Sequence, residues 1–355
     1  MPSAKRALNP VPVERLARSS ALARQAAKRF ELAYSSCQER SALQFRIAEV
    51  PFSLRTAGTG LRAFLGTAFT HLVADSGEPK VEIAVWDGAS TGVAMPAPAW
   101  NAGDTISHGF LPSLSDSATS VFYDTDRRDF LVVDTRIQEA YRWLAEAGGL
   151  PDHERAAPMR QALQCLLRPR GVTVCHAAAV GMGTRGLLVV GPGGHGKSTV
   201  ALTCLAAGWS YAGDDYVGVS AAPPSAHSLY GSAKVDPGFA GGCPSLAEFL
   251  PGAQGTSAGK LLLWPGLISS SRMARSLRIT AIVVPRVSGE DRPRVEPGRS
   301  ADALKALAPT SLFQSERPSA GDFRVFAELS RTVPVYRLSL GGRPDLIPAV
   351  LEPVL

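Results

Sequence analysis

The chemistry of this chain is most evident in residues 191–198, which read GPGGHGKS. The segment fits the pattern G-x-x-x-x-G-K-[ST] at every defined position. Glycines let successive backbone N–H groups turn toward an anion, and a helix that follows adds the positive end of its dipole. In such loops the lysine contacts the β- and γ-phosphates and the hydroxyl residue binds Mg²⁺. The sequence therefore predicts a site for the phosphates of ATP, with Lys197 and Ser198 in these two roles.

The flanking residues favour a phosphate loop over an ordinary turn. The apolar run LLVV precedes the loop and TVALTCLAAG follows it, as expected for a strand, a loop and a helix in succession. A glycine-rich turn with an exposed lysine is the alternative. His195 occupies a position that the pattern leaves open. The residues expected to contact the nucleotide are Gly191, Gly193, Gly194, His195, Gly196, Lys197, Ser198 and Thr199.

Two adjacent acids, Asp214 and Asp215, follow Ser198 by 16 and 17 residues, at the end of the short apolar segment WSYAG. In a parallel α/β sheet that end of a strand faces the same crevice as the phosphate loop. One acid there can hold Mg²⁺, and the other can take a proton from an attacking hydroxyl. The alternative is a solvated pair of acids in a turn.

Single basic residues extend the candidate site. His176 lies in the apolar segment VCHAAAV, 15 residues before the loop, where a histidine is more often a core residue than a ligand. Beside a phosphate loop and an acid pair it could contact metal or phosphate. Only seven of the 37 basic residues are lysines. Lys234 and Lys260 are two of them, and each is a candidate for a phosphate or substrate contact or, alternatively, a surface charge.

Three segments together resemble a known family. Their order and spacing resemble those in the catalytic core of the HPr kinase/phosphorylase family. The segments are HAAAV at 176–180, GPGGHGKST at 191–199 and GDDYV at 213–217. They also resemble, more distantly, ATP-dependent phosphoenolpyruvate carboxykinase. The resemblance covers roughly residues 155–350, and the tail from residue 333 is similar to the closing strand and helix of HPr kinase-like proteins.

The resemblance implies a role for each matching residue. Asp214 would be the general base toward a serine hydroxyl, and Asp215 a metal-side acid that shares Mg²⁺ with Ser198. His176 would lie beside the metal or the γ-phosphate, and Lys197 would bind phosphate. The catalytic set is therefore expected to be Asp214, Asp215, His176 and Lys197.

The sequence also departs from the family. The long segment that follows the acid pair in HPr kinases and helps to grip the protein substrate is not found. The arginine that contacts the transferred phosphate is not identifiable. Arg272, Arg275 and Arg278 are candidates only because they are near in the sequence. The resemblance to hexameric HPr kinases leaves a homo-oligomer as one expectation, but the different N-terminal half removes the basis for a specific number of subunits.

These features predict an Mg-ATP-dependent kinase that acts on a hydroxyl. The acceptor would be a serine of a small protein or peptide, or a small molecule. A nucleotide-binding regulator without transfer chemistry is the second hypothesis, and a carboxykinase-like decarboxylating enzyme is a third. ATP turnover distinguishes the first from the second, and the short chain argues against the third.

The elements that must position these residues fall into two parts. Residues 36–150 are expected to form a smaller α+β domain, with strands at LQFRIAEV and VEIAVWDG and a helix over residues 60–75. Residues 91–118 are rich in Pro, Gly, Ser and Ala and predict a long surface connection. SVFYDTDRRDFLVVDT predicts two strands around a polar turn. No catalytic pattern is evident in this half.

Residues 151–355 alternate strands with helices and predict an α/β fold. The resemblance implies that this fold is of the HPr kinase-like, P-loop type. PMRQALQCLLRPRG reads as a helix ended by glycine, and VTVCHAAAVGM as one strand. The next segments are RGLLVVG, which predicts a second strand, the helix from the loop to Gly208, and WSYAGDDYVGVS, which predicts a third strand. The acid pair interrupts this last strand, so the loop and the acids are expected at strand ends, whereas His176 is expected inside a strand.

Charge and composition restrict the other possibilities. Residues 1–30 hold seven basic residues and one acid, which is the entire formal excess of +6. The body of the chain is thus neutral, and nucleic-acid binding is not expected. Residues 1–35 predict a basic helix or arm that is either frayed or docks an acidic partner; a transit sequence is disfavoured by the bacterial character of the kinase motifs.

The remaining totals fit a cytoplasmic protein with a core. The chain is 45% hydrophobic and 19% charged. The sequence contains no run of 18 or more apolar residues, so no membrane span is expected. The first residues lack the apolar core of a secretory signal peptide. The five cysteines are widely spaced without a C-x-x-C pair, so they are expected to be reduced core residues.

Overall fold

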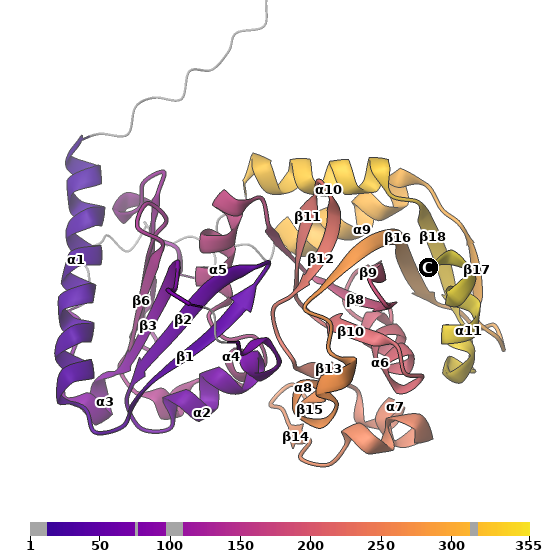
Figure 1. The fold of residues 1–355 in the computed structure, drawn as a ribbon, viewed down its shortest axis with the longest axis horizontal. Coiled ribbons are helices and arrows are strands. Elements are labelled where there is room, and N and C mark those ends of the chain that lie inside the picture. Colours follow the sequence, from indigo (N-terminus) through magenta and orange to yellow (C-terminus); the bar gives the residue numbers. More distant parts are fainter. Residues whose placement is uncertain (1–12, 75–76, 97–108, 313–318) are drawn as a thin grey trace, which may run out of the picture.

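The computed structural model describes residues 13–74, 77–96, 109–312 and 319–355. Within these ranges the chain forms two large sheets that lie side by side, each flanked by helices (Figure 1). The first sheet belongs to the N-terminal part of the chain and the second to the C-terminal part. The fold is therefore mixed α/β, as the alternation of strand and helix patterns predicts. None of the described helices combines the length and the hydrophobicity needed to cross a membrane.

The N-terminal sheet has six strands in the order β1-β2-β3-β6-β5-β4. Its central pairs β2–β3 and β3–β6 are parallel, and the outer pairs are antiparallel. The strands are β1 (Arg40–Ile47), β2 (Val50–Ala57), β3 (Val81–Asp87), β4 (Thr119–Asp124), β5 (Asp129–Asp134) and β6 (Glu139–Leu144). The two strands expected around a polar turn at residues 124–128 are β4 and β5.

The first expected strand is shorter than predicted. LQFRIAEV does not continue as one strand, because Ala48 and Glu49 both adopt left-handed φ angles of 49° and 62° and form a two-residue turn. β1 and β2 pair across this turn in an antiparallel hairpin from Ile47–Val50 onward. Two-residue hairpin loops of type I′ need such angles at both positions, and neither residue is the glycine or asparagine that normally signals them.

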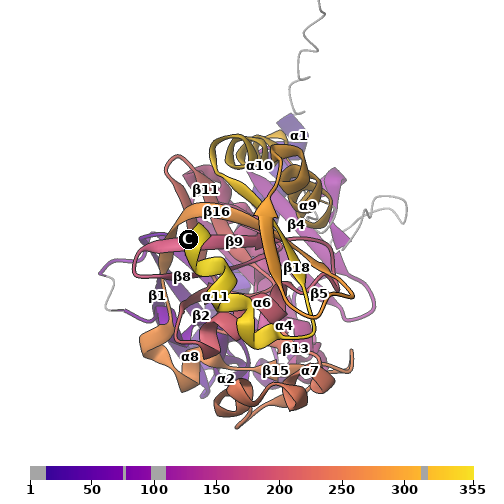
Figure 2. The same cartoon turned by 90° about the vertical axis from the view of Figure 1, so that its right-hand side faces the viewer.

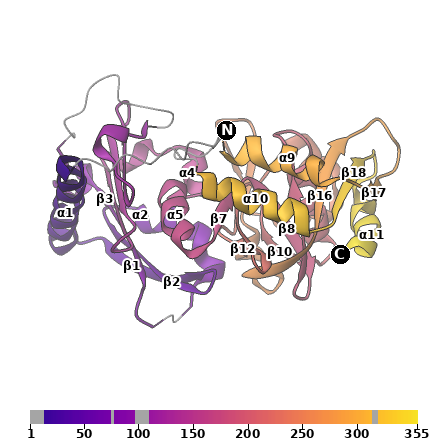
Figure 3. The same ribbon diagram turned by 90° about the horizontal axis from the view of Figure 1, so that it is seen from above.

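Helix α1 (Val13–Ser36) packs on one face of this sheet. Ala23, Ala26, Phe30 and Ala33 are buried against strand residues such as Trp86. The opposite face is covered by α5 (Arg160–Leu167), which lies between the two sheets (Figure 3). The expectation of a frayed basic helix is therefore wrong for the part of α1 that follows residue 17, because its alanines and Phe30 form an apolar stripe that the sheet buries.

The connection expected at the surface is partly buried. Residues 97–108 lie outside the described part of the chain. On either side of them Met95, Leu111 and Leu114 are buried in the same cluster as α1. The small and polar composition of residues 91–118 thus hides a few apolar anchors that hold both ends of the connection against the sheet.

The C-terminal sheet has nine strands. Its main path runs β10-β8-β9-β16-β12-β11-β7, and β18 pairs with both β16 and β17. The strands are β7 (Thr173–Cys175), β8 (Ala177–Met182), β9 (Arg185–Val190), β10 (Ser210–Gly213), β11 (Val217–Ala221), β12 (Pro224–Ser228), β16 (Ser276–Val287), β17 (Arg294–Pro297) and β18 (Val335–Leu340).

The directions of these strands decide where the candidate residues meet. Only β9–β16 and β16–β18 are parallel pairs, so the sheet is mixed rather than parallel. β9 and β10 are both antiparallel to β8 and therefore run the same way. The loop after Val190 and the acids after Gly213 leave the sheet at the same edge. The loop and the acid pair are therefore close together, as expected. The reason is that β9 and β10 flank the antiparallel strand β8, and not that the sheet is parallel.

The segment VTVCHAAAVGM is two strands and not one. β7 ends at Cys175 and β8 begins at Ala177, so His176 stands at the break. β7 pairs with β11, whereas β8 pairs with β9 and β10. The apolar run hides this change of partner, because both strands are buried on both faces and show no alternation.

Helices cover both faces of the C-terminal sheet. α6 (Lys197–Ala206) and α11 (Ile347–Leu351) pack on the face that carries Val189 and Leu187. α9 (Ser300–Leu312) and α10 (Ala320–Thr332) pack on the face that carries Leu188 and Val190 (Figure 2). Successive residues of β9 thus face opposite layers, as a strand buried on both sides requires.

Shorter elements complete the fold. Where residues 60–75 predict one helix, α2 (Leu61–Gly66) passes into a 3₁₀ segment, η1 (Thr67–Leu72), and α5 similarly ends in η5 (Arg168–Arg170) before Gly171. A three-stranded sheet is formed by β13 (Ala233–Val235), β14 (Gln254–Gly255) and β15 (Leu261–Leu263). The other short helices are α3 (Gly88–Thr91), α4 (Asp152–Ala156), α7 (Pro237–Gly242) and α8 (Pro265–Ile268). The other 3₁₀ segments are η3 (Pro112–Leu114), η4 (Ala147–Gly149), η6 (Pro244–Phe249), η7 (Ser270–Arg272), η8 (Pro344–Leu346) and η9 (Glu352–Val354).

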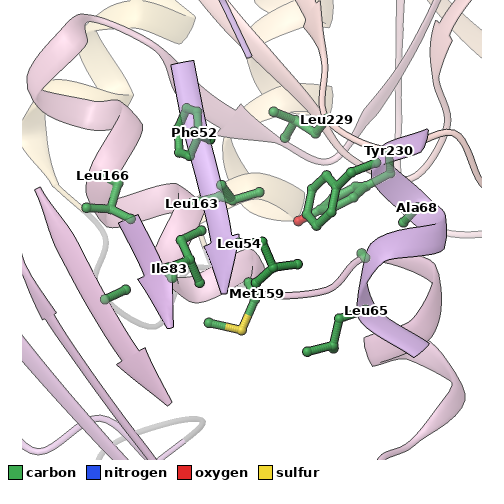
Figure 4. Close-up of a cluster of buried hydrophobic side chains, with 14 of the residues drawn as sticks. Phe52, Leu54, Leu65, Ala68, Ile83, Met159, Leu163, Leu166, Leu229 and Tyr230 are labelled. Atoms are coloured by element: carbon green, nitrogen blue, oxygen red, sulfur yellow. The ribbon is translucent and has the colours of Figure 1, made fainter. Parts of the chain in front are cut away.

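The two parts share one apolar core. Leu229 and Tyr230, which follow β12, join Phe52, Leu54 and Leu163 in a single buried cluster (Figure 4). Polar contacts cross the same boundary: His71 Nε2 lies 2.7 Å from Ser228 Oγ, and the Gly231 N–H donates to the Ala68 carbonyl. The N-terminal sheet is therefore fixed against the strands that carry the acid pair.

Candidate functional site

The glycine-rich loop of residues 191–196 joins β9 to α6. Gly194 and Gly196 have left-handed φ angles of 79° and 92°, which favour glycine. A Cβ at Gly196 would lie only 2.1 Å from Leu340 Cδ1, whereas one at Gly193 or Gly194 would meet no atom within 4 Å. The loop is thus tightly packed against β18 at Gly196 and has open space next to Gly193 and Gly194.

Lys197 begins α6 and folds back beneath the loop. Its side chain is buried, and Nζ donates to the carbonyl oxygens of Gly191 at 2.8 Å and Pro192 at 3.2 Å. Burial lowers the pKa of this ammonium, while the acid pair opposes the shift. The following residues Ser198 and Thr199 are half-buried in the first turn of α6. Among the described residues, the lysine is held in place by these neutral carbonyl groups and has no ion-pair partner.

His195 is half-buried at the open position of the loop. Its backbone N–H donates to the Pro192 carbonyl at 3.4 Å, which closes the loop on itself. The imidazole is therefore placed at the loop by the backbone turn, beside the residues expected to contact a nucleotide.

Asp214 follows β10 and is buried beside Ser198 and Lys197. The residue is 2% exposed, and neither carboxylate oxygen has a hydrogen-bond partner among the described residues. Burial, together with the charge of Asp215, raises the pKa of Asp214, while Ser198 and Lys197 act in the opposite direction. A buried carboxylate without partners is costly, so its retention beside the loop needs a reason other than packing.

Asp215 occupies the opposite side of the pair. It has a left-handed φ of 67°, which is uncommon for a residue other than glycine. Lys234 Nζ lies 2.9 Å from Oδ2, and His176 Nε2 lies 3.9 Å from Oδ1. Burial acts to raise the pKa of Asp215, but His176 and Lys234 hold it below its ordinary value. Asp215 is thus an ionised carboxylate flanked by two basic side chains.

His176 is positioned by the break between β7 and β8. Its backbone N–H donates to Ser311 Oγ at 3.1 Å, and its ring lies 5.6 Å from the ring of Tyr216. Nδ1 is buried without a partner among the described residues. The structure therefore brings His176 and Lys234, two residues whose roles the sequence left open, to the same acid. Lys260, by contrast, is exposed in the turn before β15.

The three arginines chosen by sequence proximity lie at the wrong end of the sheet. Arg278 pairs with Arg185, the first residue of β9, whereas the loop follows its last residue about 16 Å further along the strand. Arg272 binds Glu248 and the Leu205 carbonyl near the far end of α6, and Arg275 donates to the Val73 carbonyl. None of the three is placed to contact a phosphate at the loop.

A cavity of about 660 Å³ lies next to the acid pair, on the side of Asp215. One wall comes from β4, β5 and the turn between them, with β6 behind; the other comes from α4, the start of α5, and residues 215, 216 and 234. Its charged residues are Asp124, Arg127, Asp129, Arg142, Glu154, Arg160, Asp215 and Lys234. Apart from Asp215 and Lys234, no sequence pattern points to this cavity, because its other residues come from separate elements and share no motif.

Arg142 is the most buried charge of this cavity. Its guanidinium binds the Asp129 carboxylate through Nε and Nη2 and donates from Nη1 to Glu154 Oε2 at 2.7 Å. Its side chain is only 6% exposed. On the opposite wall, the Arg160 guanidinium lies 5.1 Å from the ring centroid of Tyr216. These contacts connect the N-terminal sheet to α4, α5 and the acid pair through one charged lining.

The donor atoms at the loop suit a hard cation. Among the described residues, no group of three or more His, Cys, Asp or Glu side chains forms a metal site. Mg²⁺, however, usually keeps several waters and binds through one or two carboxylates together with substrate phosphates. The unpartnered oxygens of Asp214 and the neighbouring Ser198 hydroxyl fit that requirement.

Comparisons with known proteins add a distant resemblance. No protein-family model matches the chain, and no curated protein matches it either. Among solved structures, the chain is similar to the Hpr(Ser) kinase/phosphatase from Coxiella burnetii, with 14% sequence identity and a TM-score of 0.28. That match covers 51% of this chain and 95% of the other. The functional argument therefore depends on the residues of the site itself.

Proposed function

We propose that this chain is an Mg-ATP-dependent phosphotransferase that moves the γ-phosphate of ATP to a hydroxyl group. The observation that carries the proposal is the arrangement at the end of β9. There, a complete G-x-x-x-x-G-K-S loop leads into α6, with Lys197 buried beneath it and the unpartnered carboxylate of Asp214 beside Ser198. Phosphate loops of P-loop enzymes combine the same groups.

The loop would bind the phosphates through groups that are already in place. Within the described part of the chain, Lys197 donates to two neutral carbonyls alone, so a phosphate oxygen can replace them at little cost and with a stronger charge-assisted bond. The open space above Gly193 and Gly194 lets an anion approach the backbone closely. The N-terminal end of α6 adds its dipole.

The two acids would divide the remaining work. Bound Mg²⁺ would neutralise charge that develops on the phosphates during transfer. Asp214 and Ser198 would hold it, since both lie at the loop, whereas Asp215 faces the cavity and would accept the proton of the acceptor hydroxyl. This division reverses the order that the family resemblance implies for Asp214 and Asp215. His176 and Lys234 would orient Asp215.

Nucleotide binding by the purified full-length protein tests the first part of the proposal. We expect Mg-ATP to bind to the wild type, and Lys197→Ala to weaken ATP binding or turnover by at least about 100-fold, since a removed phosphate donor has effects of that order. Lys80→Ala is the matched control, because that lysine is exposed just before β3 of the N-terminal sheet, whereas the loop follows β9 of the C-terminal sheet. Absence of ATP binding to the wild type, or equal behaviour of Lys197→Ala, contradicts the proposal.

A second pair of variants tests the division between the acids. Asp214→Asn should abolish the dependence of ATP binding on Mg²⁺. Asp215→Asn should retain that dependence but lose phosphate transfer, because Asp215 contacts the acceptor side. The opposite result would restore the order implied by the resemblance. ATP binding without release or transfer of phosphate in the wild type would favour a nucleotide-binding regulator.

A further inference from the structure

We infer that the cavity beside Asp215 binds the phosphate acceptor, and that this acceptor is a small, uncharged, polyhydroxylated molecule such as a sugar or polyol. The inference rests on the proposed function, because Asp215 is the residue that joins the cavity to the phosphate loop. It assigns the N-terminal sheet a role in substrate recognition.

The size of the cavity favours a small molecule over a protein segment. Its volume of about 660 Å³ lies within the range of pockets that enclose metabolites. Its walls come from the β4–β5 turn on one side and from α4 and α5 on the other. A serine on a protein loop needs only its hydroxymethyl group to reach a base, so most of this volume would serve no purpose for such an acceptor.

The charges on the walls favour a neutral ligand. Four acidic side chains and four basic side chains line the cavity, so its formal charge is zero. His153 adds none near neutral pH, because burial lowers its pKa. An anionic acceptor would meet four carboxylates and a polycationic one would meet four cations. A hydroxyl group both donates and accepts hydrogen bonds, so a molecule with many hydroxyls can satisfy both sets.

Aromatic side chains supply the apolar part of the lining. Phe122 of β4 lines one wall and Tyr216 the other. Ligand pockets typically combine such apolar surfaces with a few fixed polar groups that set the orientation of the ligand. The carbon faces of a sugar ring or polyol chain suit these rings, while the charged residues bind its edges.

The position of Asp215 gives the transfer step. One acceptor hydroxyl oxygen would form a bond to the γ-phosphorus, and the bond from that phosphorus to the β-phosphate oxygen would break, releasing ADP. The hydroxyl proton would pass to the Asp215 carboxylate. Lys234 lies 2.9 Å from this carboxylate and lines the same cavity, so it would hold the acid in place as the acceptor binds.

A steric variant tests the assignment in the full-length protein. Thr125 lies exposed in the β4–β5 turn and lines the cavity, whereas the next residue, Asp126, is equally exposed but does not line it. Binding is measured calorimetrically with neutral monosaccharides, linear polyols and cyclitols, beside matched sugar acids, amino sugars and serine peptides. We expect saturable binding of a neutral compound, weakened by at least about tenfold in Thr125→Trp and unchanged in Asp126→Trp.

The outcomes separate this inference from the proposed function. ATP binding is measured on the same three proteins and should be unchanged by either tryptophan. Absence of saturable binding by every neutral compound, a preference for a charged analogue or a serine peptide, or equal binding by Thr125→Trp overturns the acceptor assignment. If the wild type binds a neutral compound but no ATP, the phosphotransferase proposal fails while the binding site remains.

Discussion

Each of the two sheets is associated with a buried aspartate, and the pKa values of these two carboxyl groups move in opposite directions. Asp116, before β4, accepts hydrogen bonds from Ser19 Oγ and from the backbone N–H groups of Ala118 and Thr119, and these lower its pKa although burial acts to raise it. Asp214 has no such partners, and burial raises its pKa. Equal burial thus produces a satisfied structural group in one region and an unsatisfied group in the other.

The same contrast holds for the buried cations. Arg142 of the N-terminal sheet is bound by the carboxylates of Asp129 and Glu154, whereas Lys197 of the C-terminal part rests on two backbone carbonyls. A charge that is fully paired contributes to the fold, and one held by neutral groups can exchange them for a ligand. The difference indicates that the N-terminal sheet supplies a rigid wall and the loop region supplies the reactive groups.

The largest expected effect is on the stability of that wall. Arg142→Met should lower the free energy of unfolding by about 3–5 kcal/mol, because it leaves two buried carboxylates without their cation. Denaturant unfolding measures the change. Arg331→Met is the control, since Arg331 pairs with Glu328 on the exposed side of α10 and should leave stability unchanged. Equal effects of the two variants would remove the distinction between a paired structural charge and a surface pair.

Nucleotide binding should stabilise the loop region by a smaller amount. At a Mg-ATP concentration about 100 times its dissociation constant, the free energy of unfolding should rise by about 2.7 kcal/mol. Thermal unfolding with and without EDTA measures this gain, which Lys197→Ala should lose. A gain that persists in Lys197→Ala would mean that the nucleotide binds elsewhere, and the contrast with Arg142 would lose its functional meaning.

Replacing the unsatisfied acid should make the protein more stable and less active. Asp214→Asn should raise the free energy of unfolding without ligand by about 1–2 kcal/mol, because a buried amide costs less than a buried ion. The same variant should lose Mg²⁺-dependent ATP binding. Asp126→Asn, in an exposed turn, should change neither property. Lower stability of Asp214→Asn would show that this carboxylate is a structural group like Asp116.

The sequence predicts the loop region better than the cavity, and the reason is physical. The phosphate loop is a contiguous motif, and each of its residues is constrained by its neighbours along the chain. The left-handed angles at Gly194 and Gly196 and the return of Lys197 to the loop carbonyls are local consequences of that motif. The acid pair can be associated with the loop because the sequence places both at strand ends, whereas His176 is associated with them by the order and spacing of the three matching segments.

The cavity depends on contacts that are distant in the sequence. Arg142, Asp129 and Glu154 come from β6, β5 and α4, and no spacing rule connects them. The break at His176 was hidden in the same way, because β7 and β8 are both fully apolar and differ only in their partners. The burial of α1 gives a weak sequence signal, because three of the four residues in its buried stripe are alanines, which have small side chains.

The smallest expected effect is the pH-dependent contribution of Asp116 to the free energy of unfolding. Because the pKa of Asp116 is lowered in the folded chain, its contribution to stability is complete above the ordinary aspartate pKa of about 4 and is lost as the pH falls through the folded value. Asp116→Asn should therefore cost about 1 kcal/mol at neutral pH, the scale of a few lost charge-assisted hydrogen bonds. Denaturant midpoints of the two proteins should converge as the pH is lowered toward about 3, because the wild-type carboxyl group then becomes neutral as well. A difference in denaturant midpoint that stays constant with pH would mean that the charge of Asp116 does not contribute to stability and that packing alone holds α1 to the sheet. The comparison between the two buried aspartates would then concern packing and not electrostatics.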